Sequence, residues 1–313
     1  MQKTVSDKQL VFAFEKTLAV TPEDAQMPHF LCLSPYFKPI ADRNVANTQG
    51  FDDKDGESFR LGDFEMLRFG PGLDTYDFET LAAIFQIINT KAKLPSAVMA
   101  KTRAAIVAGN NRVLPNFDEL NIAEDADSVT GSITIDYTFG LTSAHAINRY
   151  LNRGVDGDSI ETCRASIIRL SKTHCDLINH QTDRRDDQIP FFNIQRNKRG
   201  SYFIFFPIQM DLIFKKLLDF NLVTYRRLTA AGRAMMLWMS PISGEYEILL
   251  ENARLRSNYH RPMKEFKRDL VTGRKNQNIK PALELMEEEG FIDCWSIEGT
   301  GRKTPFVLKF TRP

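Results

Sequence analysis

The sequence lacks the residues and patterns that mark several large classes of protein. Its four cysteines among 313 residues form no CxxC pair and no zinc-finger spacing, so we expect free buried thiols. No apolar run approaches the roughly 20 residues that a membrane-spanning helix needs. The N-terminus has no apolar core like that of a signal peptide. These absences predict a cytoplasmic protein with no membrane partner.

Sequence signatures of catalysis are also missing. There is no GxxxxGK[ST] motif, which excludes a nucleotide hydrolase of the P-loop type. The five histidines include no pair separated by one residue, the cluster that a metal-assisted nicking enzyme would need beside a tyrosine. Asp52, Asp53 and Asp55 resemble part of a calcium loop but lack the later glutamate. We therefore predict that the protein is not an enzyme and uses no cofactor or metal.

Charge is unevenly distributed, although the net charge is only +1. Residues 1–140 hold 13 Lys or Arg and 20 Asp or Glu, hence −7, whereas residues 141–313 hold 28 and 20, hence +8. This asymmetry predicts a polyanionic partner for the second part of the chain.

Cations are most concentrated in residues 254–280, which contain nine Lys or Arg and only two acidic residues. A helix over residues 262–272 would place Met263, Phe266 and Leu270 on one apolar face and cations roughly opposite. The pattern indicates a helix with one side for a core and one side for an anion.

Two predicted strands, at 291–297 and 304–310, follow this region, and the glycine-rich turn between them carries two cations. Helix, helix, strand, basic hairpin and strand is the order of a winged helix, a relative of the helix-turn-helix. The C-terminal region therefore favours nucleic-acid binding.

A similar order of elements occurs earlier in the chain. An apolar stripe predicts a helix from Asp74, its N-cap, to about residue 88. Alternation predicts a strand at 132–138. Two helices follow, the first capped by Thr142 and the second opened by Asp158 as part of a capping box. A strand at 176–181 and another at 191–195 come next.

A basic turn at 196–200 then leads into a strand at 202–206. We therefore predict an α+β protein with two tandem winged-helix domains, at 62–207 and 208–313. The first is expected to bind DNA and dimerise, and the second to bind DNA. Residues 1–61 are predicted to form a partly mobile N-terminal extension, with a polar loop at 44–58.

Three stretches resemble a known family. They are FGLTSAHA at residues 139–146, LRSNYHRPMKEFK at 255–267 and ALELMEEEGFI at 282–292, the last followed by a strand, hairpin and strand. With the tandem winged-helix pattern, they make residues 62–313 similar to the replication initiator (Rep) proteins of iteron-containing plasmids, including the TrfA-like and RepA-like branches.

This resemblance implies a function. Such proteins bind direct repeats (iterons) in double-stranded DNA at the plasmid origin as monomers. They promote melting of an adjacent AT-rich region and recruit the host replication initiator and helicase. Many also form a homodimer through the first domain, and the dimer represses their own promoter. The alternative from another class is a winged-helix transcriptional regulator whose first half binds a ligand or partner.

The predicted DNA contacts divide into base-reading helices and phosphate-binding hairpin tips. The helix of the first domain offers Ser159, Thr162, Arg164, Arg169 and Lys172. The hairpin tips offer Arg196, Lys198, Arg199, Arg302 and Lys303. The start of the basic helix in the second domain offers Arg254, Arg256, His260 and Arg261.

The recognition helix of the second domain has two alternatives. One is residues 262–272, which would present Lys264, Lys267 and Arg268. The other starts near residue 278 and would present Lys275, Asn276, Gln277 and Lys280 at its N-terminus. Arg274, just before these residues, is a further predicted DNA contact. We favour the first because its basic side is continuous, and because the glutamates at 287–289 would repel phosphate.

Overall fold

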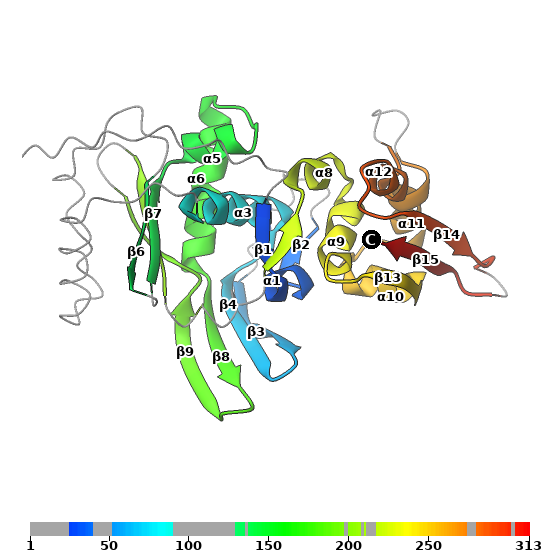
Figure 1. Ribbon diagram of the computed structural model, residues 1–313, viewed down its shortest axis with the longest axis horizontal. Coiled ribbons are helices and arrows are strands. Elements are labelled where there is room, and N and C mark those ends of the chain that lie inside the picture. Colours follow the sequence, from blue (N-terminus) through cyan, green and yellow to red (C-terminus); the bar gives the residue numbers. More distant parts are fainter. Residues whose placement is uncertain are drawn as a thin grey trace, which may run out of the picture.

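The protein mixes helices with several small sheets, which confirms the α+β class (Figure 1). The computed structural model describes residues 25–39, 52–89, 129–134, 137–196, 200–207, 210, 217–273, 280–301 and 304–313. In this view the helices and the larger sheets of the first part of the chain lie on the left, and the helices and sheet formed by residues 222–312 lie on the right (Figure 1).

The helices are α1 (His29–Leu33), α3 (Thr75–Asn89), α5 (Ala144–Tyr150), α6 (Gly157–Lys172), α8 (Leu222–Arg227), α9 (Ala230–Met239), α10 (Leu250–Arg256), α11 (Met263–Val271) and α12 (Ala282–Glu288). One antiparallel sheet has the order β3 (Asp52–Leu61), β4 (Phe64–Pro71), β8 (His174–Asn179), β9 (Arg184–Pro190). A second has the order β10 (Asn193–Arg196), β11 (Tyr202–Phe206), β7 (Tyr137–Thr142), β6 (Val129–Thr134).

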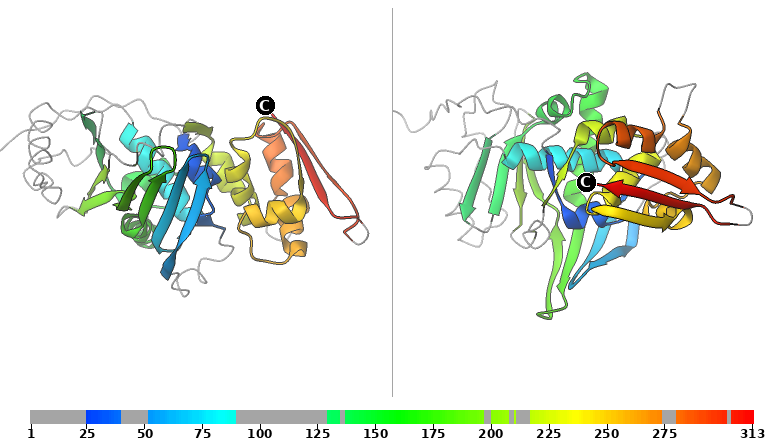
Figure 2. Two further views of the ribbon diagram at one scale, coloured as in Figure 1. Left: turned by 90° about the horizontal axis from the view of Figure 1, so that it is seen from below. Right: turned by 45° about the vertical axis from the view of Figure 1, so that its right-hand side comes forward.

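Three smaller sets of strands complete the fold. β1 (Ala25–Pro28) pairs antiparallel with β12 (Leu217–Phe220), and β2 (Phe37–Lys38) pairs parallel with β5 (Leu73–Asp74). The C-terminal sheet has the order β13 (Gly244–Leu249), β15 (Val307–Arg312), β14 (Cys294–Glu298). Its β14–β15 hairpin extends away from the rest of the protein (Figure 2).

α3 is the helix on which the first part of the chain is assembled. Asp74 caps it as predicted, since its Oδ1 accepts hydrogen bonds from the backbone N–H of Tyr76 at 2.7 Å and of Asp77 at 3.0 Å. Phe78, Leu81 and neighbouring apolar side chains of the predicted stripe are buried. The helix contacts α5, α6, β1 and β7, so it links elements that are far apart in the sequence.

The caps of α5 and α6 differ from the prediction. Ser143, not Thr142, caps α5 by accepting from the N–H of Ala146, because Thr142 is the last residue of β7. Asp156, not Asp158, caps α6 by accepting from the N–H of Ser159. Gly157 and Asp158 already have helical geometry, so the helix begins one residue before the predicted cap.

Two strand predictions also need correction. The polar segment predicted as a loop at 44–58 contains β3 from Asp52 onward, which β4 stabilises by pairing along its length. The strand after α6, β8, joins β4 and β9 and does not pair with the basic hairpin β10–β11. The first part of the chain is therefore more elaborate than the predicted winged helix, and the tandem arrangement stays a prediction.

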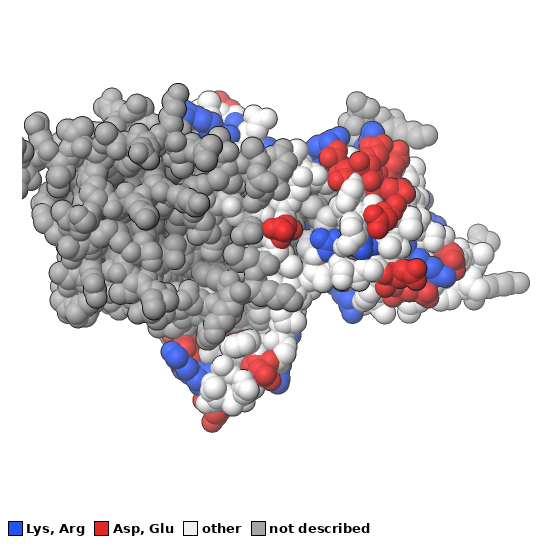
Figure 3. Space-filling view, viewed as in Figure 1, with Lys and Arg blue, Asp and Glu red and all other residues white. Residues whose placement is uncertain are grey.

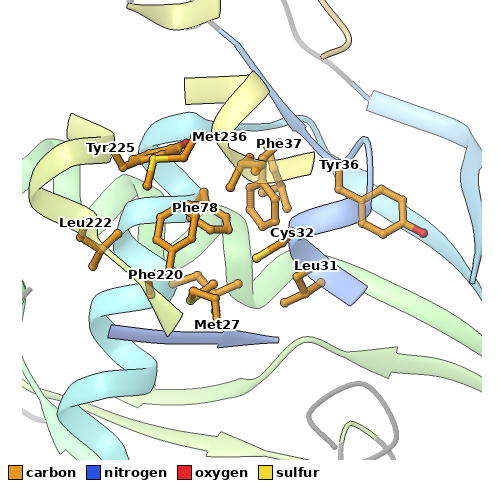
Figure 4. Packing of buried hydrophobic residues seen from close by; sticks show 14 of the residues in the cluster. Met27, Leu31, Cys32, Tyr36, Phe37, Phe78, Phe220, Leu222, Tyr225 and Met236 are labelled. Atoms are coloured by element: carbon orange, nitrogen blue, oxygen red, sulfur yellow. The ribbon is translucent and has the colours of Figure 1, made fainter. Parts of the chain in front are cut away.

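The segment 25–38, assigned by sequence to the extension, lies in the core (Figure 4). Met27, Leu31 and Phe37 are buried against Phe78 of α3 and Phe220 of β12. The Phe78 ring centre lies 5.2 Å from that of Phe37 and 5.3 Å from that of Phe220. This segment therefore packs between α3 and the start of the C-terminal part of the chain.

Candidate nucleic-acid interface

α11 forms over most of the residues predicted for it and uses one apolar face as its anchor. Phe266 and Leu270 are fully buried and Met263 is half-buried. The Tyr259 ring centre lies 5.1 Å from that of Phe266, and the helix packs on α9 and α12. Each buried large apolar side chain contributes about 1.5–3 kcal/mol, which holds α11 with its other face outward.

The outward face of α11 is basic. Arg261, just before the helix, and Lys264 and Arg268 within it are all exposed. Glu265 lies between them, 3.3 Å from Arg261 and 4.0 Å from Arg268. The two pairs with Glu265 contribute about 1 kcal/mol or less, so a phosphate can displace them at little cost. Arg268 also lies 3.4 Å from the buried Asp269 carboxylate. Lys264 has no ion-pair partner among the described residues.

Asp269 fixes the rotation of α11 about its axis. It is fully buried on the apolar face, and its Oδ2 accepts a hydrogen bond from the Tyr259 hydroxyl at 3.1 Å. Its backbone carbonyl accepts from the Thr229 hydroxyl, the cap of α9, at 3.3 Å. Burial and the Asp269 carboxylate raise the pKa of Tyr259 to about 12, so Tyr259 remains a hydrogen-bond donor at neutral pH.

The turn of the β14–β15 hairpin contacts α11 through Phe306, the residue directly before β15. The Lys267 ammonium lies 3.6 Å from the centre of the Phe306 ring, a cation–π contact. Gly299 turns the chain with a φ of +97°, and a Cβ there would lie 2.2 Å from the Pro305 carbonyl oxygen, so only glycine fits. The predicted tip contacts Arg302 and Lys303 lie outside the described residues.

The loop before α11 is supported by α10. Arg254 donates to Glu251 at 2.6 Å and to the Tyr259 carbonyl oxygen at 2.9 Å, so it positions this loop. Arg256 is exposed and donates to the Tyr246 hydroxyl at 2.8 Å. His260 is exposed. Arg254 therefore has a supporting role, while Arg256 at the end of α10 and His260 in the loop before α11 are exposed.

α12, the helix of the second alternative, has an acidic outer face. Glu284, Glu287, Glu288 and Glu289 are exposed, and acidic atoms cluster over this part of the surface (Figure 3). Lys280 is exposed but lies 2.7 Å from Glu288. Arg274 and Lys275 fall outside the described residues. Among the described residues, the cationic helix face is thus that of α11.

The predicted contacts on α6 serve several roles. The Ser159 hydroxyl bonds the capping Asp156, and the Thr162 hydroxyl donates to the Asp158 carbonyl oxygen. Arg169 binds the buried carboxylate of Asp77 on α3, with Nη2 and Oδ1 2.8 Å apart. Arg169 therefore ties α6 to α3.

The remaining predicted contacts of the first part are more accessible. Lys172 is exposed at the end of α6 and Arg196 is exposed at the end of β10, while Arg164 is half-buried and pairs with Glu161. Lys198 and Arg199 lie outside the described residues. Cations of α6 and of the β10–β11 hairpin are thus candidates for a second contact with DNA.

Sequence reasoning did not single out Tyr259 and Asp269, although one signal was present. Asp269 follows Phe266 by three residues and precedes Leu270, so it falls on the apolar stripe of the helix. An acid in that position needs a buried hydrogen-bond partner. Tyr259, ten residues earlier, could not be identified as that partner without the fold.

The part of the chain that the structure describes contains neither a membrane-spanning helix nor a metal cluster. No helix there has the length and apolar character needed to cross a membrane. The same residues contain no group of three or more His, Cys, Asp or Glu placed to hold a metal ion.

Comparison with known proteins gives structural neighbours only. No protein-family model and no curated protein sequence matches the chain. One crystal structure of RctB domains 2–3 aligns with a TM-score of 0.48 and 9% identity, covering 86% of this chain and 96% of that one. A second, of a selenomethionine derivative, has a TM-score of 0.44 and 11% identity, with 90% and 99% covered. At this level of similarity the match by itself assigns no function.

Proposed function

We propose that this chain is a DNA-replication initiator that binds direct repeats in double-stranded origin DNA, with α11 as the recognition helix of its C-terminal part. The observation that carries the proposal is the set of exposed cations formed by Arg261, just before α11, and Lys264 and Arg268 within it. The opposite face of this helix is buried in the core. A short helix presented in this way fits the major groove of B-DNA.

The hairpin beside α11 supports a winged-helix mode of binding. β14 and β15 follow α12 directly, and Phe306, in the turn of the hairpin directly before β15, touches Lys267 of α11. The hairpin is therefore held next to the recognition helix, where it can follow the DNA backbone. Arg256, exposed at the end of α10, is a further candidate for a phosphate contact.

The acidic face of α12 restricts the side from which the duplex can approach. The exposed glutamates of α12 would repel phosphates, so the duplex is excluded from that side. Cations on one helix and carboxylates on the neighbouring helix together allow one approach of the duplex and disfavour the other. This complementarity affects association rate and register more than final affinity.

The resemblance of residues 139–146, 255–267 and 282–292 to plasmid Rep proteins supplies the rest of the proposal. From this resemblance we propose that the bound monomer promotes origin melting. It would also recruit the host replication initiator and helicase in the bacterial cytoplasm. A homodimer formed through the first part of the chain would repress the promoter of its own gene. The transcriptional regulator remains the competing function.

Footprinting on the DNA that adjoins the gene tests the proposal. We expect protection of several direct repeats of about 20 base pairs, roughly two helical turns each. Protection of a single inverted repeat and nothing else would favour the regulator. No protected segment in any adjoining DNA, from protein that is folded by circular dichroism, would overturn sequence-specific origin binding.

A further inference from the structure

Three arginines from different elements surround one buried carboxylate, that of Glu79 on α3. Arg153, in the loop before α6, lies 2.5 Å from it, Arg233 on α9 lies 3.1 Å from it, and Arg226 on α8 lies 3.5 Å from it. Among the described residues, no other carboxylate pairs with any of the three. Three positive charges therefore meet one negative charge, and we call these four residues the Glu79 cluster.

Two of these arginines use their guanidinium groups within the fold. Arg153 is only 7% exposed and lies over the Tyr76 ring, 3.6 Å from its centre. Arg233 donates through Nε to the Leu228 carbonyl oxygen at 3.1 Å and through Nη2 to that of Arg226 at 2.6 Å. Both side chains are therefore held in place by contacts beyond the one with the carboxylate.

Arg226 differs from them because its donors are largely unused. Its Nε lies 3.5 Å from Glu79, longer than an ordinary hydrogen bond of about 3 Å. Its guanidinium donates no hydrogen bond to the residues that the structure describes, and 27% of the side chain is exposed. Burial lowers the pKa of Arg226; Glu79 opposes this shift, and Arg153 and Arg233 add to it. Because an arginine stays charged in proteins, Arg226 is an accessible cation in an environment that is already positive.

An anion that reaches Arg226 would relieve this excess of positive charge. Free N–H groups of a guanidinium bind a phosphate through two parallel hydrogen bonds, and the two neighbouring arginines add attraction. Glu79 is 4% exposed and keeps Arg153 and Arg233 as partners. Arg226 can therefore turn toward a phosphate without leaving the buried carboxylate unpaired.

The position of α8 indicates which phosphate this would be. α8 lies where the first part of the chain meets the C-terminal helices (Figure 1). α9, which follows α8 in the chain, contacts α3 and also α11, the proposed recognition helix. A phosphate bound by Arg226 would thus lie between the two parts of the protein.

We propose that Arg226 binds one phosphate of the DNA backbone at the junction of the two parts, with Arg153 and Arg233 contributing positive charge. This inference rests on the proposed function, and it adds a residue that the sequence did not single out. The contact fixes the position of the duplex and carries no base information.

Arg227, the next residue of α8, provides a matched control. Its side chain is 51% exposed, but it pairs with Glu289 at the end of α12, so its charge is already neutralised. In duplex titrations at several salt concentrations, Arg226→Gln should reduce the slope of log K against log salt by about one unit. It should also lower the association constant about tenfold or more, the loss expected for a hydrogen bond to a charged group. Arg227→Gln should leave the slope unchanged, and an equal fall in both variants would overturn the inference.

A scan of the duplex with methylphosphonates, which remove the charge of one phosphate at a time, distinguishes a direct contact from a structural role. One substituted position should weaken binding of the wild-type chain and have no effect on binding of Arg226→Gln. The same set of sensitive positions in both proteins would overturn the contact. Arg226→Lys keeps the charge but not the planar fork, so it should keep the wild-type slope and lose part of the affinity.

The melting temperature of Arg226→Gln should stay level, because Arg226 has no close hydrogen-bond partner among the described residues. Failure of this variant to fold would assign Arg226 a structural role and overturn the inference. Inorganic phosphate that stabilises the wild-type chain but not Arg226→Gln, with equal duplex affinity for both, would assign the site to a free anion and overturn the DNA contact.

The outcome for α11 separates this inference from the proposed function. A slope that falls in Lys264→Gln but not in Arg226→Gln refutes the contact at Arg226 alone. Failure of the wild-type chain to bind any duplex refutes the proposed function and this contact together.

Discussion

Glu79 joins the two parts of the protein, and replacing it tests that junction. Its side chain, on α3, is 4% exposed and contacts three arginines. Arg153 lies 2.5 Å away, Arg233 on α9 lies 3.1 Å away, and Arg226 on α8 lies 3.5 Å away. One buried carboxylate therefore compensates cations from both sides of the molecule.

Glu79→Gln should lower the free energy of unfolding by about 3–5 kcal/mol. This is the usual cost of removing one partner of a buried ion pair, because the other charge is left uncompensated. Arg226 and Arg233, about a quarter exposed, can turn toward solvent, whereas Arg153 is only 7% exposed and cannot. Most of the cost should therefore come from Arg153. Adding Arg153→Met to the variant should recover part of the loss, because it removes the uncompensated charge.

Urea denaturation at pH 7, followed by circular dichroism, measures this change. Glu288→Gln is the control, because Glu288 is 41% exposed and pairs with Lys280 at the surface; its effect should stay within about 1 kcal/mol. A loss below about 1 kcal/mol for Glu79→Gln, or a double variant less stable than the single one, would refute the role given to this carboxylate.

Two further substitutions test the core and the support of α11. Met27→Ala should lower the free energy of unfolding by about 2–5 kcal/mol, because Met27 is fully buried and its loss leaves a cavity. An effect below about 1 kcal/mol in the same denaturation assay would show that segment 25–38 does not pack in the core. The pKa of Tyr259 is raised from 10.0 to about 12, so its stabilising contribution is complete below pH 10 and is lost as the pH rises toward 12. Unfolding free energies at pH 9, 10 and 11 should therefore fall less steeply for Tyr259→Phe than for wild type, and equal slopes would contradict the assignment.

Helices with a strong apolar stripe could be predicted from the sequence. The stripe of α3, the buried face of α6 and the face of α11 around Phe266 all match the structure. These signals are local, because the period of apolar residues along a helix reports which side is buried. The cap of α3 at Asp74 was found for the same reason, since a capping residue acts on the next few N–H groups.

Pairings between distant segments could not be predicted. β1 and β12 are joined by backbone hydrogen bonds that leave no mark on either sequence. β3 begins with acidic residues that are typical of a loop. It forms a strand because β4 pairs with it; Glu57 of β3, for example, lies opposite Arg68 of β4. Propensity at such positions is overridden by tertiary contacts.

The candidate site shows the same division. Exposed cations of α11 could be located from spacing alone, because they lie opposite its apolar stripe. Their partners could not: Arg169 looks like an outward cation on α6, yet it binds Asp77 of α3.

The most direct test of the central claim is a titration of α11 variants on the protected repeat and on a random duplex at two salt concentrations. Lys264→Ala and Arg268→Ala should each lower affinity for the repeat, by about 1–3 kcal/mol where the side chain reads a base. Lys280→Ala, an exposed lysine beside α12, is the matched control and should have a smaller effect. If both α11 variants bind the repeat like wild type, or if Lys280→Ala loses the most specificity, α11 is not the recognition helix.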